Sequence, residues 1–168
     1  MKKLTHIDEN GTARMVNVEA KGATARVAIA QAMLELAPET LRLLLEGGLP
    51  KGDALGCARI GGIMAAKRAA ELIPLCHPIP LDVVDINFEI TEDPPAIKIL
   101  AETRCHAKTG VEMEAIIAAQ TAAAIIYDMA KAVQRDMLIT GVRLLYKNGG
   151  KSGEFRAPDF TGSPGSRS

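Results

Sequence analysis

The stretch VDINFEITEDPPAIKILAETRCHAK, residues 84–108, decides the fold, because apolar and polar side chains alternate along almost all of it. Val84–Glu92 alternates without a break, Asp93–Pro95 interrupts the pattern, and Ile97–Lys108 resumes it. A period of two places one side of each segment against a core and the other toward solvent. Two such segments joined by a proline-containing turn predict an antiparallel β-hairpin.

Helical segments are predicted on both sides of this hairpin. Asp53 is a suitable N-cap for a helix that runs to about Leu72. This helix contains three glycines, which lower its stability relative to alanine. Their presence therefore indicates that a neighbouring backbone or a ligand approaches the helix closely. A shorter helix begins at Pro38 and ends at the Gly47-Gly48 pair. After the hairpin, a long alanine-rich helix is expected from Glu112 to about Val133.

Further strands complete the predicted sheet. Thr24–Leu34 is ambiguous, because its alanines favour a helix whereas the period of Arg26–Ile29 favours a strand. We predict a strand there, a last strand over Met137–Lys147, and a short extended piece over Arg14–Ala20. The resulting order, strand–helix–strand–strand–helix–strand, is typical of a ferredoxin-like α+β domain with helices packed on one face of an antiparallel sheet.

The chain has the length of one domain, with 168 residues. We expect residues 1–13 to form a flexible lead-in, 14–156 a single catalytic domain, and 157–168 a disordered tail rich in Gly, Pro and Ser. Aromatic residues make up 3% of the chain and Trp is absent, so small aliphatic side chains must fill the core. Because alanine buries little area, subunit contacts are favoured.

Charge and composition exclude several classes of protein. The 20 basic and 20 acidic side chains cancel, which argues against binding to nucleic acid or to an acidic membrane surface. No run of 18 apolar residues and no secretory signal is present, so we expect a cytoplasmic protein. The three cysteines fit reduced thiols, and with the three histidines they show no paired-ligand spacing, so no metal site is predicted.

Three segments could carry chemistry, and each has a plainer interpretation. Leu75, Cys76 and His77 lie between prolines, on a rigid loop that is either a functional segment or a simple connector. On the long helix, Asp128 and Lys131 lie about 60° apart and Glu114 about 40° from Asp128, on one stripe. An Asp–Lys pair can support acid–base chemistry, but most such pairs are surface ion pairs.

The third segment is KNGGKSG at 147–153, whose glycines leave backbone N–H groups free beside two lysines. It could wrap a phosphate or serve as a flexible linker. It is not a Walker A loop, since Leu145 stands where the first glycine of that pattern would fall. Basic residues also flank the glycine-bearing helix, where a solvated face is the usual interpretation; they are Lys51, Arg59, Lys67 and Arg68.

Together these segments resemble the MoaC family. The resemblance rests on LIPLCHPIP at 72–80, GVEMEA at 110–115, YDMAKA at 127–132 and KNGGKSG at 147–153, and the arrangement of 51–78 also matches. It implies a ferredoxin-like lyase of the phosphorus–oxygen class in molybdenum cofactor biosynthesis. The implied reaction converts (8S)-3′,8-cyclo-7,8-dihydroguanosine 5′-triphosphate to cyclic pyranopterin monophosphate and releases pyrophosphate.

The resemblance also implies the site residues. Asp128, Lys131 and Lys51 match catalytic positions. The substrate-binding positions are matched by Leu75, Cys76, His77, Glu112, Met113, Glu114, Lys67, Lys147 and Lys151. No cofactor is required, although Mg²⁺ could accompany the triphosphate. The family implies a homohexamer, a trimer of dimers, with active sites at subunit interfaces, and we expect one positive pocket formed by Lys51, Lys67, Lys131, Lys147 and Lys151.

Two other classes remain open from the residues. One is a ferredoxin-like module that binds a nucleotide without transforming it. The other is an RNA-binding module of similar topology, which the scarcity of aromatic side chains disfavours. Turnover of the cyclised GTP, measured as pterin product and pyrophosphate, distinguishes the three.

Overall fold

The predicted hairpin is confirmed in the computed structural model of the chain, which describes residues 11–165. Strands β2 (Val83–Glu92) and β3 (Pro95–Ala107) pair antiparallel, from Val83 opposite Arg104 to Glu92 opposite Pro95. The odd-numbered residues 97–105 of β3 are buried, whereas the even-numbered residues 98–104 are half-buried. Residues 1–10 of the expected lead-in and 166–168 of the expected tail lie outside the described residues.

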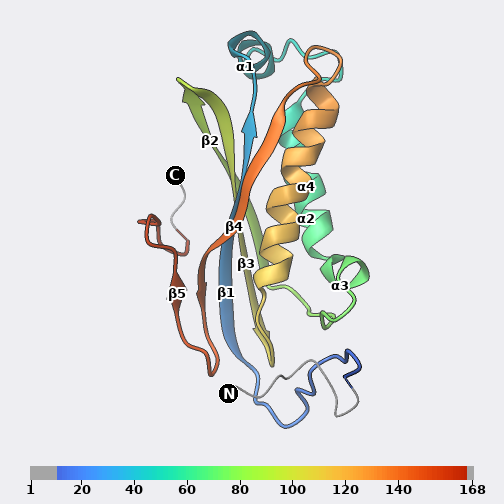
Figure 1. Cartoon of the computed structure of the whole chain (residues 1–168), viewed down its shortest axis with the longest axis vertical. Coiled ribbons are helices and arrows are strands. Elements are labelled where there is room, and N and C mark those ends of the chain that lie inside the picture. Colours follow the sequence, from blue (N-terminus) through green and yellow to red (C-terminus); the bar gives the residue numbers. More distant parts are fainter. Residues whose placement is uncertain (1–10, 166–168) are drawn as a thin grey trace.

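The hairpin is half of a larger antiparallel sheet with the order β2-β3-β1-β4-β5 (Figure 1). Strand β1 (Thr24–Glu35) lies between β3 and β4 (Leu138–Asn148), and β5 (Phe155–Arg156) pairs with the end of β4. The strand predicted over 24–34 is therefore confirmed. Two neighbouring strands satisfy its backbone hydrogen bonds, and this tertiary pairing outweighs the helical preference of its alanines.

Helices α2 (Ala54–Ala66) and α4 (Glu112–Ala130) cover one face of this sheet and run antiparallel to each other (Figure 1). Helix α1 (Pro38–Leu45) lies beyond the end of β1. The first four strands, α2 and α4 follow the predicted order, which confirms the ferredoxin-like α+β class.

Three sequence predictions of element bounds are wrong. The helix expected over 53–72 is divided, because the chain turns at Arg68 (φ −112°, ψ 11°) before the short helix α3 (Ala69–Leu72). Helix α4 ends at Ala130 rather than Val133, where a tight turn hydrogen-bonds Val133 N–H to the Ala130 carbonyl oxygen at 2.8 Å. No strand forms over 14–20, where the side chains are mostly exposed.

The core is filled by small side chains, as the composition predicts. Alanines on the inner side of α4 are fully buried, and they are Ala115, Ala118, Ala119, Ala122 and Ala123. Gly62 of α2 lies directly against this helix, since a Cβ atom placed on it would be 3.0 Å from the Ala118 carbonyl oxygen and would collide with Ile86. The expected close approach at a glycine of this helix is therefore confirmed, and it brings the two helices together.

We expect Gly62→Val to destabilise the protein by about 1–3 kcal/mol, because the added atoms would force α2 away from α4. Chemical denaturation monitored by circular dichroism measures this change. Gly22→Val is the matched control, since a Cβ atom on exposed Gly22 meets no atom within 4 Å. A Gly62→Val protein as stable as the Gly22→Val protein would contradict the expected crowding.

Helix α4 has the length and composition of a membrane-spanning helix, with a mean hydropathy of 1.2 over its most apolar window. It is the one such helix among residues 11–165. Half of that window is buried inside the protein, against the sheet and α2. Helices of this composition also occur as central helices of ordinary domains.

Part of the tail expected to be disordered has a defined path on the outer face of the sheet. Ala157 is buried, and its N–H donates to the Leu145 carbonyl oxygen at 2.8 Å. The chain continues to Gly165, whose N–H donates to a Glu102 carboxylate oxygen at 2.8 Å. The bias toward Gly, Pro and Ser favoured disorder, but a few specific contacts of this segment with the sheet outweigh it. We call Ala157–Gly165 the C-terminal strap.

Candidate active site

Three of the predicted residues meet at the C-terminal end of α4, in what we call the upper half-site: Lys51, Asp128 and Lys131. The ammonium nitrogen of Lys51 lies 2.6 Å from Asp128 Oδ2, and that of Lys131 lies 2.7 Å from Asp128 Oδ1. Lys51 reaches Asp128 because it precedes α2, which starts beside the end of α4. All three side chains are about half exposed, so they are accessible to a substrate.

The two lysines determine the charge state of this half-site. Hydrogen bonds from Lys131 and Lys51 lower the pKa of Asp128 from 3.8 to about 2, and Asp128 in turn raises the pKa of Lys131. The half-site therefore carries one carboxylate between two ammonium groups at neutral pH. The surplus positive charge suits a phosphate, and the Asp128 carboxylate would be able to accept a proton if an incoming anion drew the lysines away.

We expect the Asp128 carboxyl group to titrate at about pH 2 and to shift up toward 3.8 in a Lys131→Met protein. The direction follows from the loss of the hydrogen bond that lowers the pKa most. NMR titration of the side-chain carbonyl carbon measures both values. In Lys98→Met, which removes the ion-pair partner of Glu89 instead, Asp128 should titrate as in the wild type. An unchanged pKa in Lys131→Met would contradict the assigned cause.

The other end of α4 carries a second group of predicted residues, the lower half-site: Cys76, His77, Glu112, Met113 and Glu114. Glu114 is 4% exposed, and burial raises its pKa, with a further contribution from Glu112. Burial likewise raises the pKa of the Cys76 thiol, and the negative charges of both glutamates add to it. Cys76 on the proline-rich loop therefore lies close to the first turn of α4.

Loop residues and backbone groups position this half-site. His77 Nε2 lies 2.9 Å from the carbonyl oxygen of Val16, which ties the proline-rich loop to the N-terminal segment. The buried Thr103 hydroxyl donates to the Val111 carbonyl oxygen at 3.0 Å and so attaches the start of α4 to β3. Leu75 is half-buried on the same loop.

The KNGGKSG segment lies beside the lower half-site. It forms the turn of the β4–β5 hairpin, and a small hollow is lined both by its residues 147–149 and by 110–112 at the start of α4. Gly149 has φ +110°, and a Cβ atom there would collide with the Ala25 carbonyl oxygen, so only glycine fits. The Lys147 ammonium group donates to the Ser152 hydroxyl. We call residues 147–153 the glycine loop.

Sequence analysis missed Arg26, which also lines this hollow. Its Nη1 donates to the Gly149 carbonyl oxygen at 3.2 Å, and its Nε is the one buried side-chain nitrogen without a partner among residues 11–165. The missed signal was its position in β1, where an arginine occupies the side of the strand that carries buried alanines. A buried charged group is costly unless it has a partner, so the Arg26 guanidinium group is available to an anionic ligand in this hollow.

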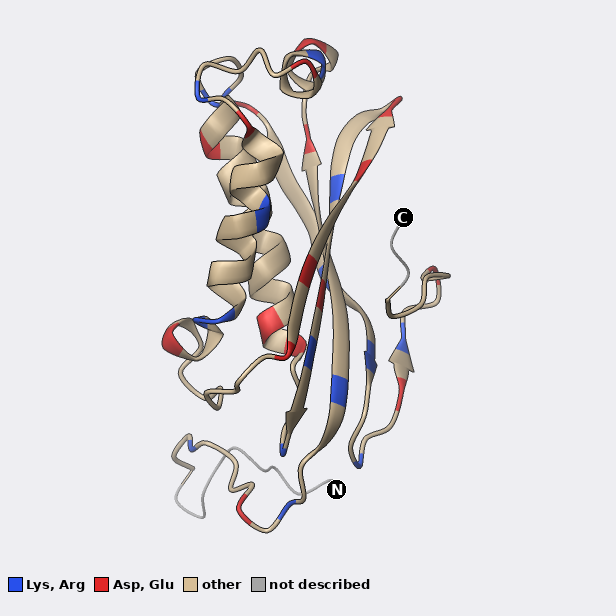
Figure 2. Ribbon diagram, turned by 180° about the vertical axis from the view of Figure 1, so that it is seen from behind, with Lys and Arg blue, Asp and Glu red and all other residues tan. Residues whose placement is uncertain are grey.

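One chain does not bring the two half-sites together. Fourteen residues separate Glu114 from Asp128, which is about 21 Å along a helix that rises about 1.5 Å per residue. The single positive pocket expected from five lysines is therefore not formed by one chain, and for an assembly of chains it stays a prediction. Lys67 follows the last residue of α2, and Lys147 lines the hollow at the start of α4, whereas Lys51 and Lys131 lie at its upper end. Figure 2 shows the ribbon of α2 and α4 mostly tan between these charged ends.

The fold is that of a ferredoxin-like α+β domain, and the lysines at its upper half-site suit an anionic ligand. A sequence model of the MoaC family matches residues 15–150. A cyclic pyranopterin monophosphate synthase of Desulfovibrio desulfuricans is 66% identical over 93% of this chain and 96% of its own length. One of Nitratidesulfovibrio vulgaris is 56% identical over 91% and 95%. The chain belongs to the MoaC family, which confirms the resemblance.

Proposed function

We propose that the chain catalyses the reaction for which these relatives are named, the formation of cyclic pyranopterin monophosphate in molybdenum cofactor biosynthesis. The substrate is the cyclised guanosine triphosphate. A hydroxyl group derived from its ribose attacks the α-phosphorus, and the bond from that phosphorus to the bridging oxygen breaks to release pyrophosphate. The observation that carries the proposal is the Asp128 carboxylate held between Lys51 and Lys131 on a chain of this family.

The upper half-site fits the proton and charge transfers of this reaction. Lys51 and Lys131 can neutralise charge that develops on the phosphates, and ammonium groups can donate protons to the opening purine ring. Asp128 can accept a proton from the attacking hydroxyl once its lysines bind phosphate oxygens instead. No redox cofactor is needed for these steps, and Mg²⁺ bound to the triphosphate would assist them.

The lower half-site fits recognition of the substrate. Glu112 and Glu114 can accept hydrogen bonds from the N–H groups of the guanine-derived ring. The free amides of the glycine loop, together with Lys147 and Lys151, can bind the phosphates that leave as pyrophosphate. Arg26 adds a cation between these two regions.

We further propose that each complete active site forms between two copies of the chain, within a homohexamer built as a trimer of dimers. The two half-sites of one chain lie at opposite ends of α4, about 21 Å apart. A small substrate that contacts both kinds of half-site therefore needs a shorter distance than one chain provides. A twofold axis across the middle of α4 would place the lower half-site of one copy beside the upper half-site of its partner. Ile60 and Met64 on the outer side of α2 are 60% and 51% exposed, which fits such a covered surface.

The test is incubation with the cyclised GTP, followed by assays of pterin product and pyrophosphate. Equal amounts of both products support the proposal, and GTP that has not been cyclised should give neither. Binding without turnover would instead support a nucleotide-binding module. We place the reaction in the cytoplasm, where three unpaired cysteines stay reduced.

A further inference from the structure

The glycine loop is held at one end by the long strand β4 but at the other by β5, which is two residues long. A two-residue strand contributes little pairing of its own, so something else must hold this end. We propose that Arg156 of β5 is a positioning residue, which fixes the glycine loop in the shape that binds the phosphates of the substrate. The phosphate role of the loop rests on the proposed function; the anchoring of the loop does not.

Arg156 links three parts of the chain through one guanidinium group. Its Nη1 donates to the Gly162 carbonyl oxygen at 2.7 Å, and its carbon Cζ lies 4.8 Å from the centre of the Tyr146 ring and 5.5 Å from that of Phe160. Its Nε lies 3.4 Å from a Glu154 carboxylate oxygen. One side chain therefore connects β4, the residue that follows the glycine loop, and the C-terminal strap.

The Tyr146 ring that Arg156 contacts belongs to a buried part of the sheet. Tyr146 is 5% exposed and stands opposite Arg156 in the β4–β5 pairing. It is packed in a small buried cluster with Ile29, Leu145 and Ala157. A cation–π contact to a buried ring is stronger than one to an exposed ring. A hydrogen bond from a charged donor is likewise stronger than one between neutral groups. Arg156 is thus attached to a rigid part of the molecule.

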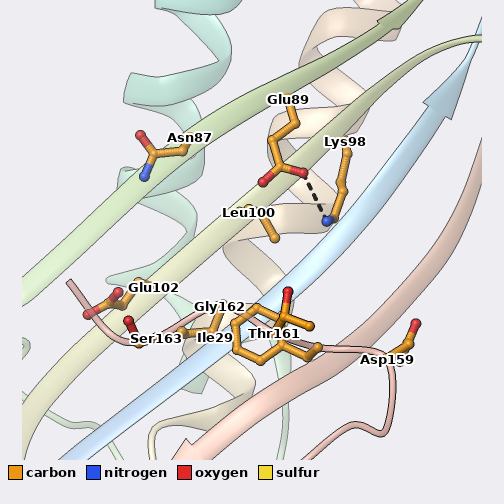
Figure 3. Close-up of a pocket in the computed structure, with 11 residues that line it drawn as sticks. Ile29, Asn87, Glu89, Lys98, Leu100, Glu102, Asp159, Thr161, Gly162 and Ser163 are labelled. Atoms are coloured by element: carbon orange, nitrogen blue, oxygen red, sulfur yellow. Dashed lines mark hydrogen bonds and ion pairs between the residues drawn. The ribbon is translucent and has the colours of Figure 1, made fainter. Parts of the chain in front are cut away.

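The strap that follows β5 is attached to the sheet at separate points, and Arg156 joins the first of them, around Ala157, which is buried, and Phe160, to the end of the glycine loop. Asp159, Thr161 and Gly162 line a pocket of about 320 Å³ together with residues of β2 and β3, and Figure 3 shows Thr161 and Gly162 drawn across β1. At the pocket, the strap is held by the Arg143–Asp159 ion pair and by the hydrogen bond from Gly165 to Glu102. These contacts and the buried Ala157 hold the strap itself, whereas the side chain of Arg156 is the link from the strap to Glu154, so its loss would loosen β5 where the glycine loop ends.

The glycine loop is held on its β4 side by Arg26, which donates to the Gly149 carbonyl oxygen, and by the contact of Lys147 with Ser152, but its backbone is flexible toward β5. Its glycines at 149, 150 and 153 have φ values of +110°, +71° and +66°, and these residues have wide conformational freedom. Its internal backbone hydrogen bond joins Gly153 N–H to the Gly150 carbonyl oxygen at 3.2 Å. Loosening of β5 would therefore allow the loop to sample many shapes, and only a fraction of them would present the amides to phosphate.

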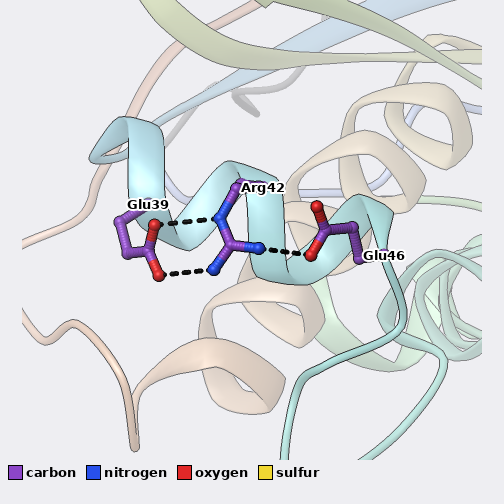
Figure 4. Close-up of polar contacts among 3 residues, drawn as sticks. All are labelled: Glu39, Arg42 and Glu46. Carbon is purple, nitrogen blue, oxygen red and sulfur yellow. Dashed lines mark hydrogen bonds and ion pairs between the residues drawn. The ribbon is translucent and has the colours of Figure 1, made fainter.

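The experiment compares Arg156→Gln with Arg42→Gln in the full-length chain. Arg42 on α1 forms an exposed ion-pair cluster with Glu39, at 2.7 Å, and with Glu46, away from the glycine loop (Figure 4). Both substitutions remove one guanidinium group from a set of surface contacts. Hydrogen exchange of the backbone amides of 149–153 is measured without ligand, and pyrophosphate affinity is measured by calorimetry.

We expect the loop amides of Arg156→Gln to exchange several-fold faster, with unchanged exchange in β1 and α4. If the binding-competent fraction falls to about a tenth, pyrophosphate affinity falls about tenfold. KM for the cyclised GTP should rise by a similar factor with little change in kcat. This result is expected when a lost interaction contributes equally to binding of the substrate and of the transition state. Arg156→Lys should recover part of the affinity, since its ammonium group can still reach the Gly162 carbonyl oxygen and the Tyr146 ring.

Two outcomes would overturn the proposal. One is loop exchange and pyrophosphate affinity in Arg156→Gln equal to those of Arg42→Gln. The other is exchange accelerated equally throughout the sheet, which would assign Arg156 a general structural role. If the loop amides alone accelerate but the wild-type chain does not bind pyrophosphate, the anchoring by Arg156 stands and the phosphate role of the loop in the proposed function fails.

Discussion

An Asp128→Asn protein is expected to lose about 10²- to 10⁴-fold in kcat, the range for removal of a group that transfers protons in the reaction. Asparagine keeps the size of the side chain but cannot accept a proton from the attacking hydroxyl. It also removes the anion that lies 2.6 Å from Lys51 and 2.7 Å from Lys131, so the two ammonium groups are no longer held in place. Steady-state kinetics with the cyclised GTP measures the loss.

The matched control for this prediction is Glu89→Gln. Glu89 also belongs to a partly exposed ion pair, with the Lys98 ammonium nitrogen at 2.9 Å, between β2 and β3. This variant should retain kcat within about twofold of the wild type, as surface substitutions usually do. Retention of the wild-type kcat by Asp128→Asn would remove Asp128 from the mechanism, because the substitution leaves its position and size unchanged.

The parts of the fold that the sequence predicts are those determined by local patterns. The alternation over 84–108 is visible residue by residue, and the hairpin follows from it with nearly the predicted bounds. The path of the strap depends instead on contacts between residues that meet only after folding, such as those of Arg156 with the rings of Tyr146 and Phe160 and of Gly165 with Glu102. Amino-acid composition does not predict such contacts, and for this reason it predicts disorder over 157–165, where the structure has a defined path.

The candidate site shows the same division between local and long-range information. The helical period correctly places Asp128 and Lys131 together, since they are three residues apart. The period also places Glu114 on their stripe, yet the rise of the helix puts it about 21 Å away. The contact of Lys51 with Asp128 spans 77 residues of sequence and depends on the antiparallel approach of α2 and α4 at Gly62. No spacing in the sequence encodes that approach.

A mixture of Lys51→Ala and Glu112→Gln chains is expected to recover activity that neither protein has alone. Lys51→Ala damages the upper half-site, and Glu112→Gln damages the lower one. In a random one-to-one assembly, half of the chains have an intact upper half-site and the other half an intact lower one. If each site joins half-sites of two chains, about a quarter of the sites are complete, with about a quarter of the wild-type activity.

The control mixture pairs Lys51→Ala with Asp128→Asn, which both damage the upper half-site. Because the two residues form an ion pair within one chain, every upper half-site in this mixture is defective and no activity should return. Mixed oligomers can be verified by native mass spectrometry of chains carrying different tags. If verified mixed oligomers of Lys51→Ala and Glu112→Gln stay inactive, the half-sites are not shared between chains. Recovery in the first mixture and none in the control would mean that each substrate is bound at one chain's glutamates and transformed at its partner's lysines.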